Sequence, residues 1–150
     1  MTPPNPLTEL AERVQALTQS SRVVDFEIQI AVFGDAIWPA TDMQGRITNP
    51  NSRMSDYLAT YSDVINQDDQ DFNFPRYTAS LDAAMTLVSE GHLWTMDSWS
   101  DYDWSVGIWF YRKGTWRISS NKNRTSKTPA LALVAASLRA RAASEAHHAR

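Results

Sequence analysis

The stretch of sequence that decides the fold is LWTMDSWSDYDWSVGIWFYRKGTWRIS, which runs from Leu93 to Ser119. After Trp104 its residues alternate between two sides of an extended chain, with Val106, Ile108 and Phe110 on one side and Gly107, Trp109 and Tyr111 on the other. This period of two indicates a β-strand. Lys113 and Gly114 form a tight-turn signal that leads into a short strand over 115–119, and Leu93–Met96 begins the strand that precedes Trp104. The stretch therefore predicts an antiparallel meander of three strands over 93–119.

Helical periodicity lies on both sides of this meander. Four apolar patterns with three- and four-residue spacing each follow a residue that favours a helix N-cap, and these caps are Thr8, Ser20 or Ser21, Thr78 and Thr128. Pro129 is expected at the first position of the last helix. Gly34 and Gly91 are expected to end the second and third helices. Helices packed on a small antiparallel sheet give the predicted fold class, an α+β protein built as an α/β/α layered sandwich.

The composition indicates one globular domain. The chain has 150 residues, of which 43% are hydrophobic and 21% are charged, and it contains no cysteine. A chain of this length can bury enough surface to fold without a metal or a disulfide, so we expect 1–150 to form a single domain. Proline, glycine and an acidic run interrupt 35–76, which we expect to be a long irregular insertion with a short helix over Ser55–Ile65. Residues 145–150 should form a frayed tail.

The sequence argues against several classes of function. A net charge of -3 disfavours general DNA or RNA binding. Its apolar runs are shorter than the roughly 20 residues that cross a bilayer, and the N-terminal residues do not form a secretory signal, so the expected location is the cytoplasm. Glycine-rich phosphate loops and the G-x-S-x-G nucleophile elbow are absent from the sequence. We therefore expect a protein that is not an enzyme and that uses no cofactor.

Candidate metal ligands are sparse in the sequence. Asp97, Asp101 and Asp103 lie close together, but their spacing departs from that of a calcium-binding loop. The acidic run over 68–71 is typical of a solvated loop. No ligand set surrounds the histidines, which are His92, His147 and His148. We expect no metal site.

Three stretches together resemble a known family. They read SRVVDFEI from Ser21, YTASLDAAMTLV from Tyr77 and TPALALVAASLRA from Thr128. In type and order these residues resemble the phage ABA sandwich domain family, which consists of small proteins encoded by phages and prophages. The resemblance implies an α/β/α layered fold and a phage context, and hence the cytoplasm of the bacterial host. It implies no catalytic motif.

Charge is distributed unevenly along the chain. The stretch from Arg112 to Lys127 is basic and has no acidic residue, whereas 56–103 is strongly acidic. Cations beside aromatic rings suit phosphate and nucleobase recognition. The predicted ligand-binding residues are Trp109, Arg112, Trp116, Arg117, Lys122, Arg124 and Lys127. The competing interpretation is that the tryptophans pack across strands while the cations extend beside them into water.

Two functions follow from these features. The first is a phage-encoded, non-enzymatic accessory protein that binds a small anionic, nucleotide-like ligand and sequesters a nucleotide immune signal of the bacterial host. The alternative is a protein-interaction module that docks a host or virion protein through its aromatic residues and the acidic loop over 63–71. Pockets often form at subunit interfaces, which leaves a homo-oligomer open as well.

Overall fold

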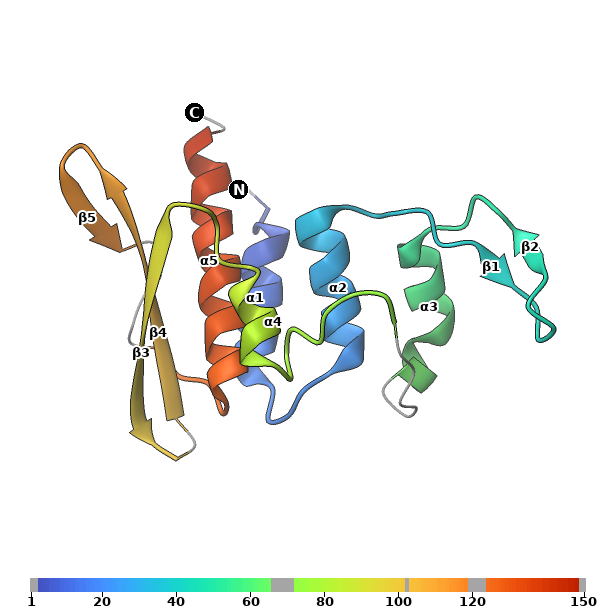
Figure 1. The fold of residues 1–150 in the computed structure, drawn as a ribbon, viewed down its shortest axis with the longest axis horizontal. Coiled ribbons are helices and arrows are strands. Elements are labelled where there is room, and N and C mark those ends of the chain that lie inside the picture. Colours follow the sequence, from blue (N-terminus) through green and yellow to red (C-terminus); the bar gives the residue numbers. More distant parts are fainter. Residues whose placement is uncertain (1–2, 66–71, 102, 119–123, 149–150) are drawn as a thin grey trace. The chain divides into compact units, whose positions relative to one another are not determined.

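The computed structural model describes residues 3–65, 72–101, 103–118 and 124–148. The elements follow one another as α1 (Pro6–Ala16), α2 (Arg22–Phe33), β1 (Ala40–Thr41), β2 (Ile47–Asn49), α3 (Met54–Ile65), α4 (Leu81–Met85), β3 (His92–Ser100), β4 (Asp103–Arg112), β5 (Thr115–Ile118) and α5 (Pro129–His148). Figure 1 shows them along the chain. Contacts divide the chain into two compact units, 1–20 together with 76–150, and 21–75. We call the first the sheet unit and the second the inserted unit.

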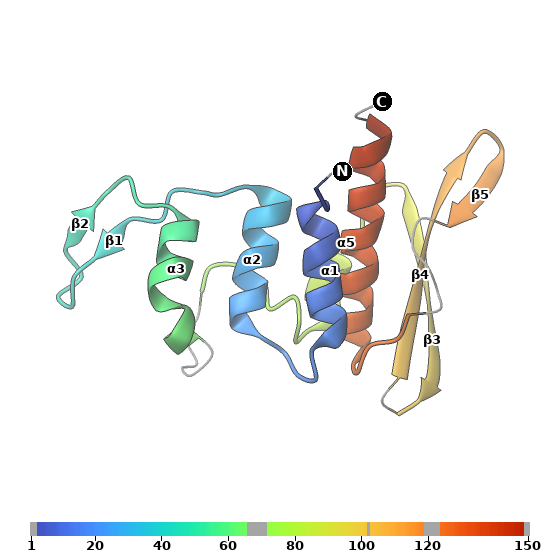
Figure 2. The ribbon, with the colours of Figure 1, turned by 180° about the vertical axis from the view of Figure 1, so that it is seen from behind.

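The sheet unit contains the predicted meander. Its strands are antiparallel in the order β3-β4-β5, and β4 pairs with both neighbours. From either side, α1, α4 and α5 lie on one side of this sheet, with α5 next to β4 (Figures 1 and 2). The predicted α+β class and the helices packed on a three-strand meander are confirmed.

Helix α5 forms the centre of the sheet unit because it packs against both α1 and β4. The predicted apolar face is buried, and so are the residues around it, so that Leu131, Leu133, Val134 and Leu138 are all inaccessible to solvent. The first two turns of α5, over 129–136, are apolar on every side, which is typical of such an interior position. The hydroxyl of Thr128 accepts a hydrogen bond from the Leu131 N–H at 3.2 Å, which confirms the predicted cap. The helix continues to His148, through part of the segment expected to fray.

Two of the predicted N-caps are wrong. The first helix begins after Asn5, whose side chain accepts from the Leu7 N–H at 2.8 Å, and the residue predicted as the cap, Thr8, lies inside the helix. Pro6 accounts for this earlier start, because its fixed φ suits the first helical turn. Ser80 rather than Thr78 caps α4, which ends at Met85 well before Gly91. Thr78 is buried instead.

The inserted unit contains regular structure where the sequence predicts an irregular segment. It begins with α2, which has the predicted cap Ser21 and ends at Gly34, a residue with φ of 98°. The segment 35–76 then forms a two-strand antiparallel sheet of β1 and β2, followed by α3. The short helix predicted over Ser55–Ile65 is confirmed, with Met54 as its first residue.

An aromatic cluster fills the core of the inserted unit. Phe26 on α2 is fully buried, and its ring lies 4.5 Å from that of Phe74 and 5.6 Å from that of Tyr57, centroid to centroid. Trp38 and Phe72 complete the contacts around it. Burial raises the pKa of the Tyr57 hydroxyl, which titrates above its ordinary range. Segments from both ends of this unit therefore converge on one phenylalanine.

Arg22 fastens the end of the inserted unit to its start. Its side chain is only 7% exposed, and its guanidinium donates to the carbonyl oxygens of Phe74 and Pro75, each at 2.9 Å, and to that of Phe72 at 3.3 Å. The same group lies 3.2 Å from the Asp25 carboxylate and 4.3 Å from the centre of the Phe74 ring. A planar, permanently charged fork can satisfy several acceptors at once, which a lysine cannot do in the same way.

We expect Arg22→Ala to destabilise the inserted unit by about 3 kcal/mol, because it removes the ion pair with the buried Asp25 carboxylate and the hydrogen bonds to the carbonyl groups of 72–75. The matched control is Arg46→Ala, which removes an exposed ion pair with Asp42 and should leave the stability nearly unchanged. Urea unfolding followed by circular dichroism, with hydrogen exchange to locate the loss in 21–75, measures both. Equal losses in the two variants would contradict the role of Arg22.

Candidate functional site

The most distinctive surface of the sheet unit is the outer face of its sheet. Strand register and alternation place on this face the apolar side chains of Leu93, Trp109, Tyr111, Trp116 and Ile118. The indole N–H of Trp99 donates to the Ser105 hydroxyl at 3.2 Å, which brings Trp99 to the same face. We call these six residues the aromatic face.

These side chains point outward because their neighbours point inward. Val106 and Ile108 on β4 are buried, and β4 is the strand that packs against α5. Alternation then directs Trp109 and Tyr111 to the opposite side. Trp99 is 72% exposed, Tyr111 59% and Trp116 51%. Large apolar side chains at this level of exposure, gathered on one surface, mark interaction sites more often than isolated exposed ones do.

Local contacts hold the aromatic face in a defined geometry. Tyr111 and Trp116 are directly opposite on β4 and β5, and their rings meet edge to face with centroids 5.2 Å apart. The Trp109 indole N–H donates to the Thr95 hydroxyl at 3.3 Å. The two-residue turn that joins β4 to β5 has positive φ at both Lys113 (51°) and Gly114 (81°), the combination that matches the twist of paired strands. Contacts within the chain itself therefore fix the geometry of the aromatic face.

The structure separates the ligand-binding residues that the sequence predicts. Trp109 and Trp116 share the aromatic face, but Arg117 lies opposite Phe110 and Arg112 lies opposite Thr115, and both pairs are on the other face of the sheet. Arg124 is exposed after the sheet, and the amine of Lys127 lies 3.8 Å from a carboxylate oxygen of Asp103. Lys122 lies outside the described residues. Arg112 and Arg117 are thus on the face of the sheet opposite to Trp109 and Trp116.

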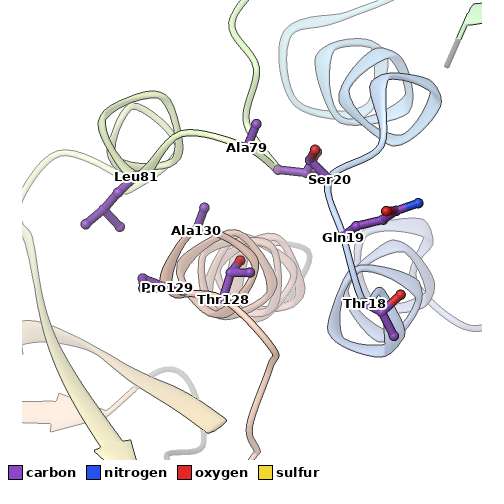
Figure 3. A pocket seen from close by; sticks show the side chains of 9 residues that line it. Thr18, Gln19, Ser20, Ala79, Leu81, Thr128, Pro129 and Ala130 are labelled. Carbon is purple, nitrogen blue, oxygen red and sulfur yellow. The ribbon is translucent and has the colours of Figure 1, made fainter. Parts of the chain in front are cut away.

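A hollow of about 480 Å³ lies beside the start of α5 within the sheet unit (Figure 3). Its lining consists of Thr18, Gln19, Ser20, Thr78, Ala79, Leu81, Thr128, Pro129 and Ala130. None of these side chains is charged. The lining consists of apolar groups with a few hydroxyls and one amide, so it offers no counter-charge for a phosphate. A smaller hollow in the inserted unit, about 370 Å³, is lined by Ile37, Trp38, Pro39, Phe72 and Asn73 and is likewise uncharged.

Two carboxylates of the described residues, those of Asp35 and Asp103, make structural contacts. Asp35 accepts the backbone N–H of Ser55 at 3.0 Å and its hydroxyl at 2.5 Å, and these bonds lower the pKa of the Asp35 carboxyl. In this way Asp35 holds the first turn of α3. Asp103 accepts from the Ser100 hydroxyl at 3.1 Å beside Lys127. Among the described residues no three His, Asp or Glu side chains are placed to hold a metal ion. The acidic residues of 68–71 lie outside that part of the chain.

Within the described residues, none of the helices is both long enough and apolar enough to span a membrane. No family model, curated protein or solved structure matches the chain.

The division of β4 and β5 into an inner and an outer face can be tested by substitution. Ile108→Ala opens a cavity beneath α5 and should cost about 3 kcal/mol of unfolding free energy. Trp116→Ala removes a half-exposed ring and its contact with Tyr111, so we expect a loss of about 1 kcal/mol. Chemical denaturation of the two variants measures the difference. A larger loss for Trp116→Ala than for Ile108→Ala would contradict the register.

Proposed function

We propose that the protein is a non-enzymatic protein-interaction module that docks through the aromatic face. The observation that carries this proposal is the outward presentation of Trp99, Tyr111 and Trp116 on one surface. Tryptophan and tyrosine are the residues most enriched among the anchors of protein interfaces. A function that depends on surface contact also needs no assembled catalytic group.

The extent of the face supports a macromolecular partner. From the exposed fractions of its side chains, the apolar part of the face covers roughly 500 Å². That value lies in the upper range for the largest apolar patch on a monomeric protein. With a rim of polar residues such as Thr95 and Asp97, both exposed on β3, it approaches the roughly 800 Å² per partner of a standard interface.

The preorganisation of the face supports the same proposal. Trp109 and Trp99 are each fixed by a hydrogen bond from the indole nitrogen to a hydroxyl on the neighbouring strand, from Trp109 to Thr95 and from Trp99 to Ser105. Side chains that are ordered before binding lose less conformational entropy when a partner covers them. The smaller entropy loss strengthens binding at a surface whose side chains are already ordered, compared with a surface whose side chains are mobile.

Sequestration of a nucleotide has weaker support from the geometry. Trp109 and Trp116 can offer rings for stacking, but Arg112 and Arg117 lie on the other face of the sheet. Phosphate recognition requires donors within hydrogen-bonding reach of the phosphate while the base is stacked. Two of the five predicted cations, Arg112 and Arg117, therefore lie away from the rings.

The setting that we propose is a phage accessory protein acting in the cytoplasm of the bacterial host. This setting rests on the resemblance of the stretches from Ser21, Tyr77 and Thr128 to the phage ABA sandwich domain family. The acidic loop over 63–71 was also expected to take part in docking. Most of that loop lies outside the described residues, so the aromatic face alone carries the proposal.

Site-specific photo-crosslinking in cells tests the docking surface. A benzoylphenylalanine introduced in place of Trp116 should form discrete crosslinks to a polypeptide, because the face is covered when the protein functions. The matched control replaces Met43, which is 97% exposed in the inserted unit, and should give none. Adding Tyr111→Ala should reduce the crosslinks from position 116. Crosslinks from position 43 only, or equal yields from both positions, would overturn the proposal.

A panel of linear and cyclic nucleotides tests the competing function. We expect no increase in melting temperature with any of them. A ligand at 100 times its Kd would add about 2.7 kcal/mol to stability, an effect that is readily seen. A shift that is abolished by Trp116→Ala and by Arg117→Ala, but kept in Ile118→Ala, would favour nucleotide sequestration over protein docking. Recovery of a chemically altered nucleotide would indicate an enzyme.

A further inference from the structure

We infer that the aromatic face binds the same face of a second copy of this chain, in a two-fold symmetric dimer whose β4 strands run antiparallel to each other. This inference rests on the proposed function, because it names the partner of that docking surface. Three features of the sheet unit carry it: the area of the face, the charges at its two ends, and the positions of its aromatic residues.

The area fits a pair of identical faces. An apolar patch of roughly 500 Å² with a polar rim gives each copy about what a standard interface buries per partner. Two sheets can pack face to face with their strands nearly aligned, and their side chains then form a common core. The face belongs to a sheet whose other side is already packed against α5, so docking needs no rearrangement of the fold.

The two ends of the face carry opposite charges. Asp101 is exposed at the turn between β3 and β4, and Asp97 lies on the face near that end by its pairing with Ser105. Lys113 is exposed in the turn between β4 and β5, at the far end of β4. Lys127, whose amine lies 3.8 Å from Asp103 at the start of β4, offsets part of the negative charge there, but three aspartates outnumber it. Strand β4 thus runs from a net acidic end to a basic end.

This polarity selects one of two symmetric arrangements. A two-fold axis along the strands would place acidic ends together and basic ends together, which like charges disfavour. An axis across the strands, within the plane of the interface, places Lys113 of each copy near Asp101 of the other. The contact is made twice in each dimer, because the interface is isologous.

The aromatic residues match in the same arrangement. Trp99 lies near the acidic end, and the Tyr111–Trp116 pair lies near the basic end. With the β4 strands antiparallel, the order of the strands across the interface is kept, so Trp99 of one copy lies at the end of the other copy's face that carries Tyr111, again twice. Edge-to-face and offset contacts between rings would then add to the area that is buried. Steric and electrostatic features therefore favour the same dimer.

Sedimentation velocity of the full chain, over roughly 1 to 200 µM, tests whether the dimer exists. We expect a species of twice the chain mass of 16.9 kDa. Trp99→Ala and Trp116→Ala should each shift the protein to monomer, while their circular dichroism stays that of the native fold. Ile37→Ala, an exposed residue in the inserted unit, is the matched control and should leave the dimer intact. A monomer at every concentration, or a dimer that survives both tryptophan substitutions, would overturn the inference.

Charge reversal tests the orientation. Lys113→Glu alone and Asp101→Lys alone should each weaken the dimer by about tenfold or more, because two contacts become repulsive in each. An equal mixture of the two variants should recover association, since each reversed site then meets its complement and the other contact is unchanged. A mixture that stays monomeric, or single variants that dimerise normally, would overturn the antiparallel arrangement.

The outcomes of this experiment are separate from those of the crosslinking test. A protein that is monomeric in solution but crosslinks from position 116 to a different polypeptide overturns the second copy as partner and keeps the docking surface. A crosslinked product of twice the chain mass supports both. A monomer without crosslinks from position 116 overturns both.

Discussion

The period of two along β4 is the constraint on which the rest of the sheet unit depends. Val106 and Ile108 must face α5 to complete its core, so Trp109 and Tyr111 are forced to the other side. Pairing then carries the same division to β3 and β5, placing Leu93 opposite Trp109 and Trp116 opposite Tyr111. A slip of one residue would bury the outer row and expose the inner one, so the core fixes the outer surface as firmly as the inner one.

The side chains of the aromatic face are not selected for burial in the core, so their residue types indicate what the face does. Threonine or lysine would satisfy the outward positions of a solvated strand without exposing apolar surface. This sheet instead carries Trp99, Tyr111 and Trp116, each more than half exposed, with hydrogen bonds and ring contacts that fix their orientation. Charges at the two turns limit unspecific association at its ends. Aromatic residues that are both exposed and ordered are suited to one defined contact.

Local patterns predicted most of the fold. The meander, the Thr128 cap, the Ser21 and Gly34 bounds of α2 and the helix near Ser55 all follow from spacing within a few residues. The wrong caps, Thr8 and Thr78, each lie within three residues of a second competent cap, and the choice between them depends on the exact entry of the chain into the helix. The Arg22 contacts with 72–75 could not be predicted, because no local pattern connects residues about fifty positions apart.

Local sequence patterns were also insufficient to predict the candidate site. Trp116 and Arg117 are neighbours in sequence and therefore lie on opposite faces of β5, because successive side chains of a strand alternate between its two faces. Grouping residues by their closeness along the chain misses this separation. Once Arg112 and Arg117 are assigned to the face opposite the rings, the surface that remains is apolar in its middle and oppositely charged at its ends. Such a surface is complementary to itself only when one copy is reversed relative to the other. Because that pairing uses the whole face on both copies, it closes at two subunits and leaves no second aromatic face to extend a filament.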